Sequence, residues 1–155
     1  MKKIPVMVAA ALLGSSLVSG CGGSSGYCDT VKADAQTLTD FTSPAVQPDF
    51  AKIPAFLKDA KDLESKSPKE VKEDWSVITS TLQSLSDGLA DVGMTYAQFA
   101  TFLSTGTLPD GVTQAQTAGL ALKYQQLGAD IVTKAANEIT QHAAHSCDVD
   151  LTRKG

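Results

Sequence analysis

The chain has 155 residues, of which 43% are hydrophobic and 19% are charged. This composition fits a folded domain and excludes collagen, a coiled-coil fibre and a multispan membrane protein. The chain carries 13 basic and 17 acidic residues, and loss of Lys2 and Lys3 with a leader would leave 11 basic residues and a net charge of about −6. Nucleic-acid binding depends on basic residues that neutralise phosphates, so we expect no nucleic-acid partner.

Residues 1–20 are typical of a bacterial secretion signal. Two lysines open the segment, an apolar stretch runs from Ile4 to Val18, and small residues precede Cys21. The apolar stretch is short for a transmembrane span. The ending resembles the lipobox of bacterial lipoproteins, which implies a diacylglyceryl group on Cys21, and two acyl chains hold a protein on a membrane for long times. An ordinary cleaved signal, with Cys21 left as a surface thiol, is the alternative.

The expected organisation follows from this leader. We expect a lipoprotein signal peptide at 1–20, a lipidated flexible Gly/Ser tether at 21–26 and a single helical domain at 27–155. The membrane is then a partner through the N-terminal diacylglyceryl-cysteine. The expected location is extracytoplasmic, on the outer face of the cytoplasmic membrane.

Two cysteines remain once Cys21 is assigned to the lipid anchor. An exported protein meets an oxidising environment, so we expect a disulfide between Cys28 and Cys147. Two buried free thiols are the alternative. No C-x-x-C motif is present, which argues against redox catalysis.

Hydrophobic residues recur with a helical period along almost the whole domain. Ser43-Pro44 ends the first helix, and Pro54 delays the regular part of the second. Capping boxes at Ser67–Glu70 and Thr95–Gln98 predict two helix starts, and Gly93 predicts a helix end. The expected helices cover, in chain order, residues 27–42, 53–65, 68–92, 96–103 and 114–147.

The third and last of these helices have the longest apolar faces. Residues spaced by three and four along the third helix predict one buried seam: Val71, Trp75, Ile78, Leu82, Leu85, Leu89 and Val92. The corresponding face of the last helix is Leu120, Tyr124, Leu127, Ile131, Ala135, Ile139 and Ala143. Gly119 and Gly128 are candidate irregularities in this last helix.

These patterns predict an all-α fold, an antiparallel up-down bundle of four to five helices. Cys28 lies at the start of the first helix and Cys147 at the end of the last. A disulfide between them would join the first and last helices. The period of the apolar residues and the positions of the cysteines therefore favour the same topology.

Several segments resemble small exported lipoproteins of actinobacteria, mostly of unassigned function. The similarity lies in Tyr27-Cys28-Asp29, in the segment from Ser67 to Trp75, in Leu108–Val112 and in His145–Leu151. It covers most of the domain, and its motifs are those of a helical scaffold. The resemblance implies a lipid-anchored, disulfide-linked helical domain outside the cytoplasmic membrane. It implies no reaction and no catalytic residue.

A metal site is a weak candidate near the end of the chain. Glu138, His142 and His145 are spaced by four and three residues, which places them on one helix face, and these side-chain types can bind zinc or copper. Two histidines and one glutamate make an incomplete site. The simpler interpretation is that both histidines are partly exposed near a helix C-terminus. We expect no cofactor.

Trp75, Phe99 and Phe102 could line an apolar ligand pocket between helices, although aromatic residues on such a seam more often pack the core. No nucleophile elbow, P-loop or dinucleotide-binding motif occurs, so we expect no enzyme. The sequence favours a non-catalytic interaction module that binds an unknown envelope protein. The alternative is a carrier or sensor for a small apolar ligand in the bundle core, and a metal-binding lipoprotein is a weaker one.

Overall fold

The computed structural model describes residues 25–42 and 49–152, in which all regular structure is helical. In chain order the elements are α1 (Ser25–Ala33), α2 (Ala35–Thr42), the 3-10 helix η1 (Phe50–Lys52), α3 (Ile53–Lys66), α4 (Lys69–Asp91), α5 (Tyr96–Thr105), α6 (Gln114–Gln126) and α7 (Asp130–Ser146). The expected signal peptide at 1–20, Cys21 and most of the expected tether lie outside the described residues. Helix α1 begins at Ser25, within the last two residues of that tether.

The three middle helices expected from the sequence are present as α3, α4 and α5. The expected first and last helices are each divided in two, so the described residues hold seven α-helices rather than four or five. Asp34 separates α1 from α2, and residues 127–129 separate α6 from α7. Gly128 lies in the second interruption, whereas Gly119 lies inside α6. The last helix is therefore not one continuous rod.

The helix ends show which of the expected proline and capping-box signals are present in the structure. Pro54 lies in the first turn of α3, where a missing N–H does no harm. Thr95 and Gln98 form the expected capping box at the start of α5. The capping box expected at Ser67 is wrong, because Pro68 occupies the N-cap position of α4. The Ser67 hydroxyl instead donates to the Glu64 carbonyl oxygen at 2.8 Å, at the end of α3.

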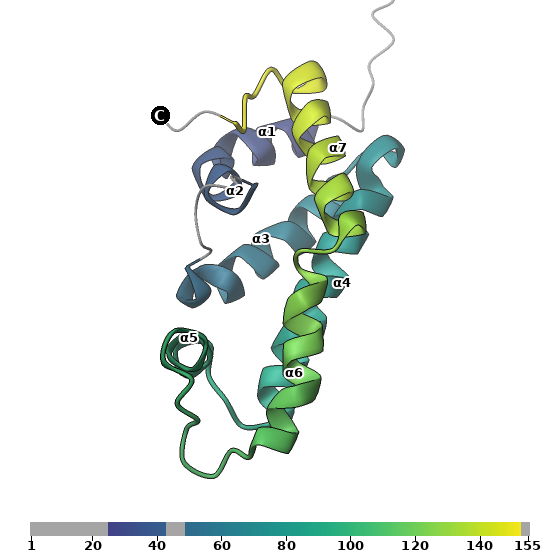
Figure 1. The fold of residues 1–155 in the computed structure, drawn as a ribbon. Coiled ribbons are helices and arrows are strands. Elements are labelled where there is room, and N and C mark those ends of the chain that lie inside the picture. Colours follow the sequence, from purple (N-terminus) through teal and green to yellow (C-terminus); the bar gives the residue numbers. More distant parts are fainter. Residues whose placement is uncertain (1–24, 43–48, 153–155) are drawn as a thin grey trace, which may run out of the picture.

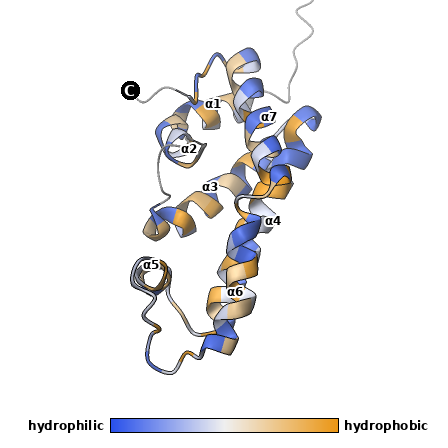
Figure 2. Ribbon diagram, in the orientation of Figure 1, coloured by the Kyte–Doolittle hydropathy of each residue, from blue (hydrophilic) through white to orange (hydrophobic). Residues whose placement is uncertain are grey.

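Helix α4 is the central element of the molecule (Figure 1). It runs antiparallel to the successive helices α6 and α7, which both pack along it. Helix α3 packs against α4 from one side, and α5 contacts η1 near the N-terminal end of α3. Figure 2 shows hydrophilic and hydrophobic residues on each labelled helix, as expected for amphipathic helices around a shared core.

The seam expected on α4 is confirmed. Its residues from Val71 to Leu89 are buried, and only Val92 at the end is half-buried. On the last pair of helices Leu120, Ala135, Ile139 and Ala143 are buried as expected. Ile131 was expected in the core, but 63% of its surface is exposed. A new helix begins at Asp130, and the neighbouring Val132 packs against the core instead.

The disulfide between Cys28 and Cys147 is confirmed, with an S–S distance of 2.04 Å. It joins α1 to the residue that follows α7, so the first and last helices are linked as expected. Leu151, four residues further on, is buried in the same core. The all-α, disulfide-linked bundle expected from the sequence is thus the observed fold.

Candidate ligand-binding groove

An apolar groove of about 540 Å³ opens between α2, α3, α4 and the junction of α6 with α7. This volume lies within the range of small-molecule sites in proteins. Its lining comprises Leu38, Phe41, Ile53, Phe56, Trp75, Ile78, Thr81, Leu82, Tyr124, Gln125, Leu127, Gly128, Val132, Thr133, Ala136, Asn137, Ile139 and Leu151. Most of these side chains are aliphatic or aromatic, so the groove favours an apolar occupant.

The division of the last helix contributes directly to this groove. Leu127 and Gly128, from the interruption, line it together with Val132 from the first turn of α7. Ala136 follows one turn later on α7 and presents only a methyl group to the groove. Gly128 has no side chain and Ala136 only a methyl group, so larger residues at these positions would fill part of the groove.

Trp75 lines the groove and is held in a defined orientation. Only 1% of its surface is exposed, and its indole N–H donates to the Tyr27 hydroxyl oxygen at 2.9 Å. Tyr27 is fully buried, and its ring meets the His142 ring edge-on with centroids 5.6 Å apart. Burial raises the pKa of Tyr27, and the hydrogen bond from Trp75 opposes that shift in part. The phenol therefore stays neutral and keeps accepting the bond.

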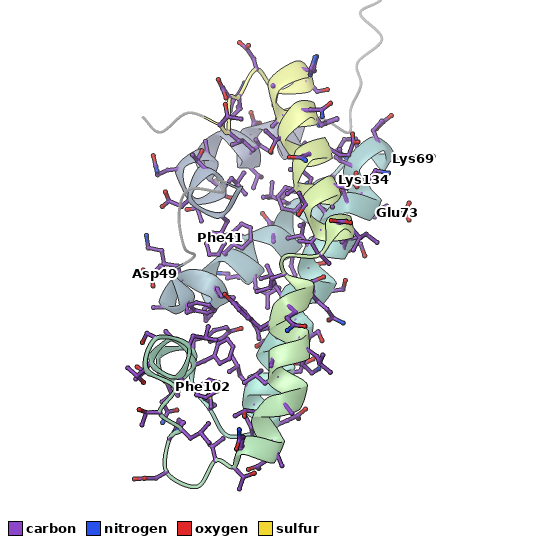
Figure 3. All side chains as sticks on the ribbon, in the orientation of Figure 1. Phe41, Asp49, Lys69, Glu73, Phe102 and Lys134 are labelled. Carbon is purple, nitrogen blue, oxygen red and sulfur yellow. A yellow bond between two sulfur atoms is a disulfide. The ribbon has the colours of Figure 1, made fainter. Side chains whose placement is uncertain are left out.

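Two phenylalanines that the sequence did not single out complete this side of the groove. The rings of Phe41 from α2 and Phe56 from α3 stack in parallel with centroids 3.9 Å apart. Figure 3 shows Phe41 extending from α2 toward α3. Phe41 lies near the end of α2. The spacing of apolar residues along that helix does not indicate that the Phe41 ring lines a groove.

Phe99 and Phe102, which were expected with Trp75, are not among the groove-lining residues. They belong to a neighbouring aromatic cluster around α5, in which Phe99 meets Phe50 and Tyr124 edge-on at 5.5 and 5.6 Å. Phe102 extends from α5 (Figure 3), and its ring centroid is 6.5 Å from that of Phe99. Tyr124 belongs to both features, since it packs on Phe99 and also lines the groove. This cluster attaches α5 and η1 to the rest of the core.

The polar residues of the groove are all uncharged. Gln125 on α6 and Thr133 and Asn137 on α7 are exposed, which places them at the rim. Thr81 on α4 is half-buried, and its hydroxyl donates to the Val77 carbonyl oxygen at 2.8 Å. Among the described residues, no Asp, Glu, Lys, Arg or His lines the groove.

The candidate metal ligands are not brought together. His145 is exposed, and its Nδ1 lies 2.8 Å from the Gln141 carbonyl oxygen, while His142 packs on Tyr27. Glu138 is exposed on α7 and faces Asp74 of α4, whose pKa it helps to raise. Residues 25–42 and 49–152 contain no group of three or more metal-ligating side chains close enough to hold an ion.

A second hollow, of about 520 Å³, lies between α1 and α3 and is lined mostly by charged residues. Its lining includes Asp29, Asp34, Lys58, Asp59 and Asp62. Burial raises the pKa of Asp34, and the charges of Asp59 and Asp62 add to that shift. These carboxylates form an acidic face with interspersed lysines, which is typical of a solvated helix surface.

One finding on the described helices and one on the sequence complete this description. None of the helices in residues 25–42 and 49–152 is long and apolar enough to cross a lipid bilayer. The sequence matches no protein-family model, and no match was found among curated proteins or solved structures.

Proposed function

We propose that this chain is a lipid-anchored, extracytoplasmic binding protein that carries a small apolar ligand in the groove between its helices. The observation that supports the proposal best is the groove itself, about 540 Å³ in volume and lined mostly by apolar side chains. The second hollow has a similar volume but is lined mostly by charged residues, so the apolar lining rather than the size makes this groove typical of a small-molecule site. The proposed action is binding, without catalysis.

The anchoring part of the proposal rests on the leader and on the disulfide. The lipobox-like end at Val18-Ser19-Gly20 places Cys21 where a lipid would be attached. The disulfide between Cys28 and Cys147 supports an exported protein, because such bonds persist in oxidising compartments. Seven residue steps separate Cys21 from Cys28, a reach of at most about 25 Å. The disulfide end of the domain would then lie close to the membrane.

Binding can be measured with N-phenylnaphthylamine, a neutral apolar dye whose emission rises when it leaves water. We expect saturable binding to the oxidised chain, accompanied by a change in the emission of Trp75, the chain's single tryptophan. Ala136→Phe places a ring in the groove and is expected to weaken binding at least about tenfold.

The matched control is Ala144→Phe, the same substitution at an exposed position of α7 outside the groove. It should bind the dye as the unaltered chain does. Equal weakening by both substitutions, with both variants folded by circular dichroism, would contradict a site in the groove.

Docking to an envelope protein is a second candidate function. Leu122 on α6 and Ile131 on α7 are large apolar residues with 64% and 63% of their surfaces exposed, and Leu103 on α5 is 41% exposed. Single exposed apolar residues are common on monomers, so they support docking less strongly than the groove supports ligand binding. Loss of a specifically captured membrane partner on Leu122→Ser and Ile131→Ser, with dye binding intact, would favour docking.

A further inference from the structure

We infer that the groove selects an electrically neutral amphiphile, with an apolar body and one uncharged hydrogen-bonding end. This inference rests on the proposed ligand-binding function and specifies the chemical class of the ligand. Two features of the lining support it: the described lining residues include no charged side chain, and their uncharged polar groups cluster along one rim.

The first feature disfavours both anionic and cationic ligands. Moving a charged group from water into an apolar site costs much more than moving a neutral polar group, unless a partner of opposite charge compensates. None of the described residues that line the groove can supply such a partner. A fatty-acid carboxylate or a quaternary ammonium group at the rim would therefore lose part of its hydration without gaining a partner of opposite charge.

The N-terminus of α7 does not offer a compensating site for an anion. This helix begins beside Gly128 and Val132 of the groove, and a helix N-terminus attracts negative charge in general. However, Asp130 already places a carboxylate in the first turn of α7. That carboxylate offsets the attraction of the helix end for an anion, and because it is exposed and does not line the groove, it gives a cation no buried partner.

The second feature indicates where the polar end of the ligand would lie. Thr133 and Asn137 are one turn apart on α7, and Gln125 lies across the α6–α7 junction. Within the described part of the chain, none of these three side chains is hydrogen-bonded to another residue, so their amides and hydroxyl can bind a ligand. Trp75, Phe41 and Phe56 line the groove with large apolar surfaces that suit the ligand's hydrocarbon body.

The test compares three probes with the same hydrocarbon chain: dodecanol, dodecanoate and dodecyltrimethylammonium. The full chain is used in its oxidised form with Cys21→Ala, so that no acyl group of its own competes for the groove. Displacement of N-phenylnaphthylamine gives each affinity. Dodecanol is expected to bind at least about tenfold more tightly than either ion. Shorter alcohols should lose about fourfold in affinity per methylene removed.

A variant that adds a charge at the rim tests the physical reason. Asn137→Lys is expected to raise the affinity for dodecanoate and to lower that for dodecyltrimethylammonium. The control is Gln141→Lys, one turn further along α7 and outside the groove, which should leave the order of the three probes unchanged.

The outcomes separate this inference from the function on which it rests. Equal or tighter binding of an ion, with the dye still bound, would overturn the neutral-ligand inference and leave the groove as a binding site. An unchanged preference in Asn137→Lys would also overturn it. Failure of the dye and of all three probes to bind would overturn both the inference and the proposed function.

Discussion

The hydrogen bond between Trp75 and Tyr27 links the groove to the disulfide end of the molecule. Trp75 lines the groove, and Tyr27 directly precedes Cys28 in the chain. Both side chains are almost completely buried, so neither polar group can turn to water instead. The orientation of the indole in the groove therefore depends on a residue from α1.

We expect Tyr27→Phe to lower the free energy of unfolding by about 1–3 kcal/mol, because the indole N–H of Trp75 loses its buried acceptor. Urea unfolding followed by far-UV circular dichroism measures the change, because this signal does not depend on Trp75. Adding Trp75→Phe should make the tyrosine substitution less costly, since the orphaned donor is then gone. Additive effects of the two substitutions would show that the hydrogen bond contributes no coupling.

The raised pKa of Asp74 predicts that the free energy of unfolding depends on pH through this residue. Burial raises its pKa above the usual 3.8, and Glu138 and Glu73 raise it further while Lys134 opposes them. Because the folded state holds this proton more tightly than the unfolded state, the stabilisation is fully present below about pH 4 and is lost as the pH rises through the folded pKa. At neutral pH the ionised carboxylate therefore destabilises the fold slightly.

We expect Asp74→Asn to be more stable than the unaltered chain at about pH 7, with the difference shrinking toward about pH 4. Urea midpoints at both pH values measure this. Asp110→Asn, in the exposed loop between α5 and α6, serves as the control for removing one negative charge. A gain in Asp74→Asn that does not exceed the control's gain at neutral pH would contradict the assigned cause.

Residues on long periodic helices were the easiest to predict. Trp75 belongs to a seam with regular spacing, so both its burial and its candidacy as a pocket residue could be read from the pattern. Phe41 and Phe56 line the same groove, but they come from two different helices whose relative placement depends on tertiary packing. Phe99 and Phe102 are placed away from the groove for the same reason.

At the scale of helices, capping differs between two segments with the same sequence pattern. Thr95 accepts a hydrogen bond from the Gln98 backbone N–H, and the Gln98 side chain accepts one from the Thr95 N–H at 2.8 Å. Ser67 has the matching spacing to Glu70 but closes the preceding helix instead. The N-cap position of α4 is one residue later, at Pro68, which has no side-chain hydrogen-bonding group, so Ser67 does not cap α4.

We expect Thr95→Ala to lower the free energy of unfolding by about 1 kcal/mol, because the N-terminus of α5 loses a side-chain acceptor. Thr95→Ser keeps the hydroxyl and should retain most of the stability. Thermal unfolding followed by circular dichroism compares the two variants. An equal loss in both would mean that packing of the threonine methyl group, rather than capping, accounts for the effect.

Among the helices, the division of the expected last helix into α6 and α7 is the main feature that the sequence does not predict. Gly128 was one of two candidate irregularities, and only the tertiary packing distinguishes it from Gly119, which is accommodated within α6. The apolar spacing continued from α6 across the interruption predicts that Ile131 is buried, but Ile131 is exposed. Because α7 is a separate helix, its rotation about its own axis decides which of its residues face the core. The spacing of apolar residues does not predict that rotation.

At the scale of the whole molecule, the disulfide closes almost the entire domain into one loop. Cys28 and Cys147 are separated by 119 residues. We expect Cys28→Ser with Cys147→Ser to lower the free energy of unfolding by about 2–5 kcal/mol, because the unfolded chain regains its conformational freedom. Urea unfolding provides the measurement. Cys21→Ala should leave this stability unchanged, and a loss of less than about 0.5 kcal/mol in the double variant would contradict a stabilising role.

The all-α class and the linkage of the first and last helices could be predicted because two independent signals, apolar period and cysteine position, agreed. Beyond Trp75, the position and the lining of the groove could not be predicted, since the groove arises where four elements meet incompletely around α4. Whether a set of helices packs fully or leaves space depends on how side-chain volumes match across elements. That matching involves residues far apart in the chain, such as Leu38 and Leu151.

Native mass spectrometry of the chain, released gently from its own membranes, tests the central claim most directly. The account predicts one non-covalently bound neutral amphiphile per chain, retained in Ala144→Phe and absent in Ala136→Phe. A chain that carries no bound small molecule, or one that carries it equally in Ala136→Phe, would contradict the assignment of the groove as a ligand site.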